Sequence, residues 1–156
     1  MFDIQLFGRV EVRTRGILLV GPDFGGDRQR HLFALLALRG PQSTAELAET
    51  LEEKKKDIES DMSALRTTME PVVRHHRGRW SLDPDQVRVD VHRFDELIAA
   101  AEGRPADRAA KPLTAAAFLA TRPLLEDEDV PWAAEARAEY RAKLVMASAG
   151  SSTITV

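Results

Sequence analysis

Residues 27–84 decide the fold, because they contain three helix patterns followed by a basic hairpin. The helical stretches are DRQRHLFALLALRG (27–40), STAELAETL (43–51) and KKDIESDMSALRTTME (55–70), and the hairpin opens with VVRHHRGRW (72–80). Apolar residues recur at steps of three and four in each helical stretch, as in amphipathic helices. The hairpin, residues 72–82, is called the wing below, and it predicts two short strands around a tight turn.

Capping residues set the limits of these helices. Asp27 is a favoured N-cap residue after Gly25-Gly26, and Gly40-Pro41 stops the first helix. Ser43 and Glu46 have the spacing of a reciprocal capping box. The expected buried residues are Leu32, Phe33, Leu35 and Leu36 in the first helix, and Ile58, Met62, Leu65 and Met69 in the third. The expected outward residues of the third helix are Glu59, Ser60, Ser63, Arg66, Thr67 and Glu70.

The flanking segments predict a sheet before these helices and further helices after them. Residues 2–6, 10–13 and 17–20 alternate apolar and polar side chains or form short apolar runs, so we expect a small N-terminal antiparallel sheet. Residues 87–91 are a brief extended piece. Further helices are expected over 92–102, 113–121 and 132–146, with a polar loop at 103–112 and an acidic loop at 122–131. Trp80 and Trp132 are expected to be core or junction anchors.

This pattern predicts an α+β fold with three parts: a winged helix-turn-helix domain over 1–84, a partial all-α domain over 85–147, and a flexible tail over 148–156. Two or three helices without strands suggest part of a TPR-like helical-repeat array, whose units usually need neighbours to bury their faces. The chain is therefore also compatible with a fragment of a larger regulator.

Composition excludes several classes of protein. The 156 residues contain no cysteine, which excludes thiol catalysis, disulfides and cysteine-ligated zinc. No apolar run approaches the ~20 residues of a membrane span, and the start of the chain lacks a signal-peptide pattern, so we expect a soluble cytoplasmic protein without a membrane partner. No nucleophile elbow, phosphate-binding glycine loop, paired carboxylates or metal-ligand spacing is present, so neither an enzyme nor a cofactor is expected.

The net charge of the whole chain does not favour binding to nucleic acid. The net charge is −3: residues 1–84 hold 13 basic and 13 acidic residues, and residues 85–156 hold 9 and 12. Attraction to phosphate must therefore come from local clustering.

Several motifs resemble one family of regulators. They are residues 2–8 with 10–12, residues 27–38, Met62-Ser63-Ala64-Leu65-Arg66, the wing, residues 89–95, and Val130-Pro131-Trp132-Ala133 with Glu135, Arg137 and Arg141. In order and spacing the chain resembles the actinobacterial SARP-type regulators, in which an OmpR-like winged helix is joined to a bacterial transcriptional activator domain. The resemblance implies a DNA-binding protein of transcription regulation, with double-stranded DNA as its partner.

The residues expected to contact DNA lie on the third helix and the wing. Ser63, Arg66 and Thr67 would read the major groove, Lys54, Lys55 and Lys56 would meet the backbone, and Arg74, His76, Arg77 and Arg79 would hold phosphates or the minor groove. A homodimer or tandem binding is expected, because one such surface makes few contacts. The same arginines also suit an anionic small molecule, although no specific motif supports one.

A second hypothesis belongs to a different class. In the family the third helix looks rich in arginine and asparagine, whereas here Arg66 alone stands in the matching outward row. Residues 54–70 carry four basic and four acidic side chains. A degenerate winged helix that binds protein and not DNA would explain this balance.

Overall fold

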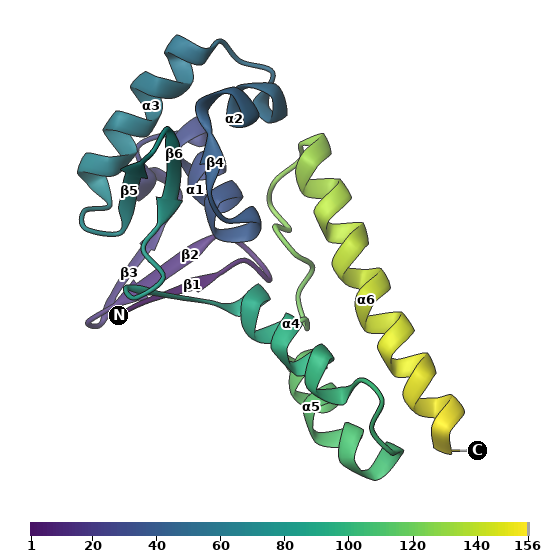
Figure 1. The fold of residues 1–156 in the computed structure, drawn as a ribbon. Coiled ribbons are helices and arrows are strands. Elements are labelled where there is room, and N and C mark those ends of the chain that lie inside the picture. Colours follow the sequence, from purple (N-terminus) through teal and green to yellow (C-terminus); the bar gives the residue numbers. More distant parts are fainter. Residues whose placement is uncertain (156) are drawn as a thin grey trace. The chain divides into compact units, whose positions relative to one another are not determined.

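The computed structural model describes the backbone of residues 1–155 and the side chains of residues 1–149. The chain divides into two compact units (Figure 1). Unit 1 comprises residues 1–4 and 10–89, and unit 2 comprises residues 5–9 and the chain from residue 90. No helix within residues 1–155 is both long enough and apolar enough to cross a bilayer.

The first sheet of unit 1 is mixed and not purely antiparallel. Its order is β3-β2-β1-β7, with β1 (Phe2–Gln5), β2 (Glu11–Thr14), β3 (Ile17–Val20) and β7 (Val87–Val89). β2 and β3 pair antiparallel as predicted, but β7 pairs parallel with β1, Ile4 facing Val89. The prediction of an antiparallel sheet was wrong in this respect. The chain returns to β1 only after three helices and the wing, and no local pattern encodes that partner.

Three helices pack in unit 1 as their apolar spacing predicts. They are α1 (Asp27–Arg39), α2 (Thr44–Leu51) and α3 (Lys55–Thr68), preceded by a short 3₁₀ turn, η1 (Gly21–Phe24). The expected residues are buried: Leu32, Phe33, Leu35 and Leu36 in α1, and Ile58, Met62, Leu65 and Met69 in or just after α3. The rings of Phe24 and Phe33 lie 5.3 Å apart, which joins η1 to this core.

The α2 capping box is formed. The Glu46 N–H donates to Ser43 Oγ over 3.1 Å, and the Ser43 N–H donates to Glu46 Oε1 over 3.1 Å. These two bonds satisfy backbone donors that a helix start would otherwise leave unpaired.

The wing belongs to a three-stranded sheet of order β4-β6-β5, with β4 (Gln42–Ser43), β5 (Val73–His76) and β6 (Arg79–Leu82). Arg77 and Gly78 both have positive φ, 51° and 75°, as a two-residue hairpin turn of the I′ type requires. Trp80 is 5% exposed, and its Nε1–H donates to Thr44 Oγ1 over 3.2 Å. The expectation that Trp80 is a core anchor is confirmed.

Unit 2 contains α4 (Asp90–Ala101), α5 (Ala106–Leu119) and α6 (Pro131–Thr155). α5 starts within the predicted loop 103–112 and includes Pro112. Burial of Ala109 and Ala116 holds α5 together despite the backbone bond that a proline removes. α6 continues beyond the predicted end at Met146, so the backbone of residues 148–155 is helical. The side chains of the predicted tail from Gly150 on lie outside the described residues.

An aromatic cluster forms the core of unit 2. The ring centroids of Phe7, Phe94 and Tyr140 lie 5.4–5.9 Å apart in pairs. The Tyr140 hydroxyl donates to Asp95 Oδ2 over 3.0 Å, and burial together with that carboxylate raises the pKa of Tyr140. Trp132 is 6% exposed, so the second predicted anchor is also buried.

Asp90 ties α4 to the segment that follows β1. Its carboxylate accepts the N–H of Leu6 over 2.9 and 3.0 Å and that of Phe7 over 2.9 Å. Burial raises the pKa of Asp90, while these backbone bonds act in the opposite direction. The carboxylate is therefore a structural part of unit 2.

Replacing Asp90 by alanine is expected to lower the free energy of unfolding by about 3 kcal/mol, because two buried N–H groups lose their acceptor. Urea unfolding followed by circular dichroism measures this. Asp107→Ala is the control, because Asp107 is an exposed residue in the first turn of α5 and should cost about 0.5 kcal/mol. Equal losses in the two variants would contradict the assigned role of Asp90.

Candidate nucleic-acid interface

The outward row of α3 is the first part of the candidate interface. Ser63, Arg66 and Thr67 stand at steps of three and four residues, and all three are exposed. The Thr67 hydroxyl donates to the backbone oxygen of Ser63 over 3.2 Å, which leaves its oxygen free to accept a bond. Arg66 has no ion-pair partner among the described side chains. α3 therefore presents one unpaired guanidinium flanked by two hydroxyls.

The start of α3 carries three lysines. Lys54 is the N-cap residue, and Lys55 and Lys56 follow in the first turn; all three are exposed. None has an ion pair among the described residues. Positive charge at a helix N-terminus opposes the helix dipole, so this placement costs some stability and leaves the three ammonium groups available to an anion.

One acidic residue of α3 does not belong to this surface. Asp61 is 8% exposed, and its Oδ2 lies 2.6 Å from Arg28 Nε. Gln29 Nε2 donates to its Oδ1 over 3.0 Å. Asp61 therefore joins α3 to α1, and the exposed carboxylates of α3 and its end are Glu59 and Glu70. The sequence pattern does not predict this contact, and its one signal is the position of Asp61 directly before the buried Met62.

The wing separates its polar and apolar side chains by strand register. Arg74 faces Ser81 and His76 faces Arg79, while Val73 faces Leu82 and His75 faces Trp80. Because side chains alternate across a strand, Arg74, His76 and Arg79 share one face of the hairpin. The opposite face packs on the core through Val73, Trp80 and Leu82. Three predicted site residues are thus brought together.

The two neighbouring histidines point in opposite directions. His75 stacks on Trp80, with ring centroids 4.0 Å apart and an interplanar angle of 15°. His76 lies on the arginine face. Within residues 1–155 there is no group of three or more histidine or acidic side chains arranged to hold a metal ion.

Two of the three wing arginines are in ion pairs. Arg79 Nη2 lies 2.9 Å from Glu46 Oε1, and Arg74 Nη1 lies 3.5 Å from Asp83 Oδ1. Their side chains are 53% and 54% exposed, so solvent screens each pair strongly and each arginine can exchange its partner for another anion. Arg77, at the turn, has no ion pair among the described residues. The wing therefore offers one free and two exchangeable guanidinium groups.

The Arg79 hydrogen bond lowers the pKa of Glu46, and the bonds of the capping box act in the same direction. A lowered pKa in the folded state means that this group stabilises the fold above the ordinary glutamate pKa and that the contribution is lost as pH falls through the lowered value. Arg79→Ala should raise the pKa of Glu46 back toward its ordinary range. Carbon-13 NMR of the Glu46 carboxyl during a pH titration measures this, and Arg77→Ala, at the free turn position, should leave the pKa unchanged.

α3 and the wing lie side by side in unit 1 (Figure 1). Together they place five unpaired cations on unit 1: Lys54, Lys55, Lys56, Arg66 and Arg77. Such an arrangement suits a polyanion with regularly spaced charges better than a single small anion, because the groups come from a helix start, a helix face and a hairpin turn.

Comparison with known proteins agrees with a regulator. The chain is a mixed α/β protein whose layout fits a winged-helix regulator. No protein-family model matches it, and no curated protein matches it. Among solved structures it is similar to Mycobacterium tuberculosis EmbR in complex with a low-affinity phosphopeptide, with a TM-score of 0.72 and 25% sequence identity. The match covers 94% of this chain and 43% of that one.

This likeness supports a SARP-like regulator. The chain corresponds to less than half the length of EmbR.

Proposed function

We propose that this chain is a DNA-binding transcriptional regulator of the SARP type. Its OmpR-like winged domain, residues 1–84, would read double-stranded DNA, and residues 85–147 would be part of a bacterial transcriptional activator domain. The likeness to EmbR over nearly the whole chain is the observation that carries the proposal. The exposed, unpaired cations of α3 and the wing form the surface that would contact DNA.

Each part of this surface has a distinct task. Arg66, with Ser63 and Thr67 on the same face, enters the major groove, where a guanidinium reads the O6 and N7 atoms of guanine. Lys54–Lys56 meet the phosphates beside the groove. Arg77 reaches the neighbouring backbone or minor groove. Arg74 and Arg79 join it when their intramolecular pairs exchange for phosphate, and His76 lies on the same face of the hairpin.

The small number of unpaired cations predicts a modest affinity for duplex DNA. One copy neutralises about five or six phosphates, which gives a slope of about −5 for log K against log salt concentration. Binding as a dimer or on tandem sites would double the number of contacts. The comparison does not favour the alternative of an interaction module without DNA binding.

Fluorescence anisotropy with a labelled random-sequence duplex at low salt tests the proposal. The chain should bind with micromolar or tighter affinity, and Arg66→Ala/Arg77→Ala should weaken binding by about tenfold or more. The two arginines are exposed and unpaired, so the variant should fold normally. Absence of binding by the unaltered chain, or equal binding by the variant, would overturn the proposal.

A further inference from the structure

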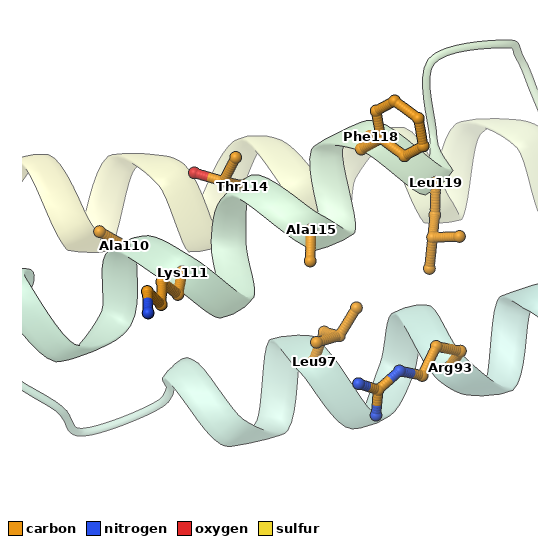
Figure 2. Close-up of a pocket in the computed structure, with 8 residues that line it drawn as sticks. All are labelled: Arg93, Leu97, Ala110, Lys111, Thr114, Ala115, Phe118 and Leu119. Atoms are coloured by element: carbon orange, nitrogen blue, oxygen red, sulfur yellow. The ribbon is translucent and has the colours of Figure 1, made fainter.

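A groove of about 580 Å³ opens between α4 and α5 in unit 2 (Figure 2). Leu97 points from α4 toward α5, Arg93 extends along α4, and the other lining residues come from α5. The complete lining consists of Arg93, Leu97, Ala110, Lys111, Thr114, Ala115, Phe118 and Leu119. None of these residues takes part in the proposed DNA surface.

The lining is mostly apolar and holds an unusually exposed ring. Five of its eight residues are alanine, leucine or phenylalanine. Leu97 is 8% exposed, whereas Phe118 is 80% exposed at the rim. Aromatic side chains, phenylalanine included, are enriched in protein–protein interfaces relative to the rest of the surface. Phe118 therefore offers an anchor that α4 and α5 leave uncovered.

The charged lining residues are both cations. Arg93 Nη1 lies 3.3 Å from Glu96 Oε2, in a surface pair whose side chains are 63% and 68% exposed. Lys111 has no ion pair among the described residues. The lining contains no carboxylate. A ligand in this groove therefore meets an apolar floor with positive charge beside it, which is complementary to an acidic surface.

The shape favours a helix over a small molecule. Small-molecule sites bury 70–90% or more of their ligand, and a groove whose phenylalanine stays 80% exposed does not enclose one. A groove between two adjacent helices can instead accept a third helix, whose apolar side chains at i, i+3 or i+4, and i+7 fill it. α5 has 14 residues, so the groove suits a partner helix of about 14 residues, which is about 21 Å long.

We propose that the α4–α5 groove docks an acidic amphipathic helix of a partner protein. Its apolar face covers Phe118, Leu97 and the alanines of α5, and its flanking carboxylates pair with Lys111 and Arg93. The proposal concerns unit 2 alone and goes beyond DNA binding, so either can fail without the other.

The probe is a synthetic 5-carboxyfluorescein peptide of about 14 residues with leucines at helical spacing and glutamates on both flanks. A second peptide has lysine at each glutamate position. The chain of residues 1–156 should bind the glutamate peptide more tightly, by about tenfold or more, as judged by fluorescence anisotropy. Phe118→Ala should weaken this binding by about tenfold. Arg93→Glu/Lys111→Glu should reverse the preference between the two peptides.

Matched controls lie on α6, outside the groove. Val145 is 61% exposed, and Val145→Ala should leave peptide binding unchanged. Arg141→Glu should likewise preserve the preference for the glutamate peptide. Circular dichroism verifies that each variant retains its helix content.

Other occupants give different results, and each would overturn the proposal. A second copy in the groove would appear in light scattering as a dimer that Phe118→Ala dissociates, without peptide binding. If the groove instead holds an aliphatic carboxylate such as decanoate, that compound would reduce the solvent exposure of Phe118, and the glutamate peptide would fail to bind. Equal binding of both peptides, or binding that Phe118→Ala does not weaken, would indicate nonspecific association and not a docking site.

Discussion

Charge reversal at the start of α3 is expected to weaken duplex binding on the order of 100-fold at low salt. The change is Lys54→Glu, Lys55→Glu and Lys56→Glu in one variant. These lysines are exposed and unpaired, so the loss comes from repulsion of phosphates and not from broken internal contacts. Glutamates also interact favourably with the helix dipole at this position, so the variant should be at least as stable as the unaltered chain.

The control for this variant has the same change in net charge on unit 2. Arg104, Arg108 and Arg141 are exposed and have no ion pair among the described residues. Replacing all three by glutamate should weaken duplex binding far less, by about threefold, because these side chains belong to unit 2, are not part of the α3 and wing surface, and act on the duplex only through the screened net charge. Fluorescence anisotropy compares the two triple variants. Equal losses would mean that net charge, and not the α3 surface, controls binding.

The largest expected effect on stability is at Phe33. Its side chain is fully buried in α1 and packs on Phe24 at a centroid distance of 5.3 Å. Phe33→Ala removes that burial and leaves a cavity, at a cost of about 3–5 kcal/mol. This is a large part of the 5–15 kcal/mol that typically stabilises a domain, so urea unfolding should shift to a much lower midpoint.

Phe118 provides the matched control for that substitution. It is also a phenylalanine within a helix, but it is 80% exposed. Phe118→Ala should change the free energy of unfolding by no more than about 0.5 kcal/mol. If Phe33→Ala cost as little as Phe118→Ala, the packing of α1 described above would be wrong.

Local patterns were sufficient to predict much of unit 1. The steps of three and four in residues 58–69 gave the buried stripe of α3, and Ser43 with Glu46 gave the start of α2. The basic stretch 74–79 indicated the hairpin turn of the wing, which the structure places at Arg77-Gly78. Each of these signals acts between residues close in the chain, where side-chain geometry determines the backbone directly.

Long-range contacts account for what the sequence did not reveal. β7 pairs with β1 across the whole of unit 1, and β4 pairs with β6 through only two residues. α5 tolerates Pro112 because its alanines pack in unit 2. None of these partners is encoded by periodicity or by turn residues.

The candidate site shows the same limit. The exposure of Ser63, Arg66 and Thr67 follows from helical spacing, and the shared face of Arg74, His76 and Arg79 follows from strand alternation. The ion-pair partners of Arg74 and Arg79 do not follow from local spacing, because the tertiary fold brings Asp83 and Glu46 next to them. The burial of Asp61 is likewise a tertiary event. The result is a surface in which the lysines and Arg66 carry more of the charge than the wing does.

The salt dependence of duplex binding tests the central claim most directly, because the slope of log K against log salt concentration counts the phosphates neutralised. The unaltered chain should give a slope of about −5, and the Lys54→Glu/Lys55→Glu/Lys56→Glu variant a slope shallower by about three units. The same slope in both proteins, or binding by neither at low salt, would contradict a DNA-reading role for α3 and the wing.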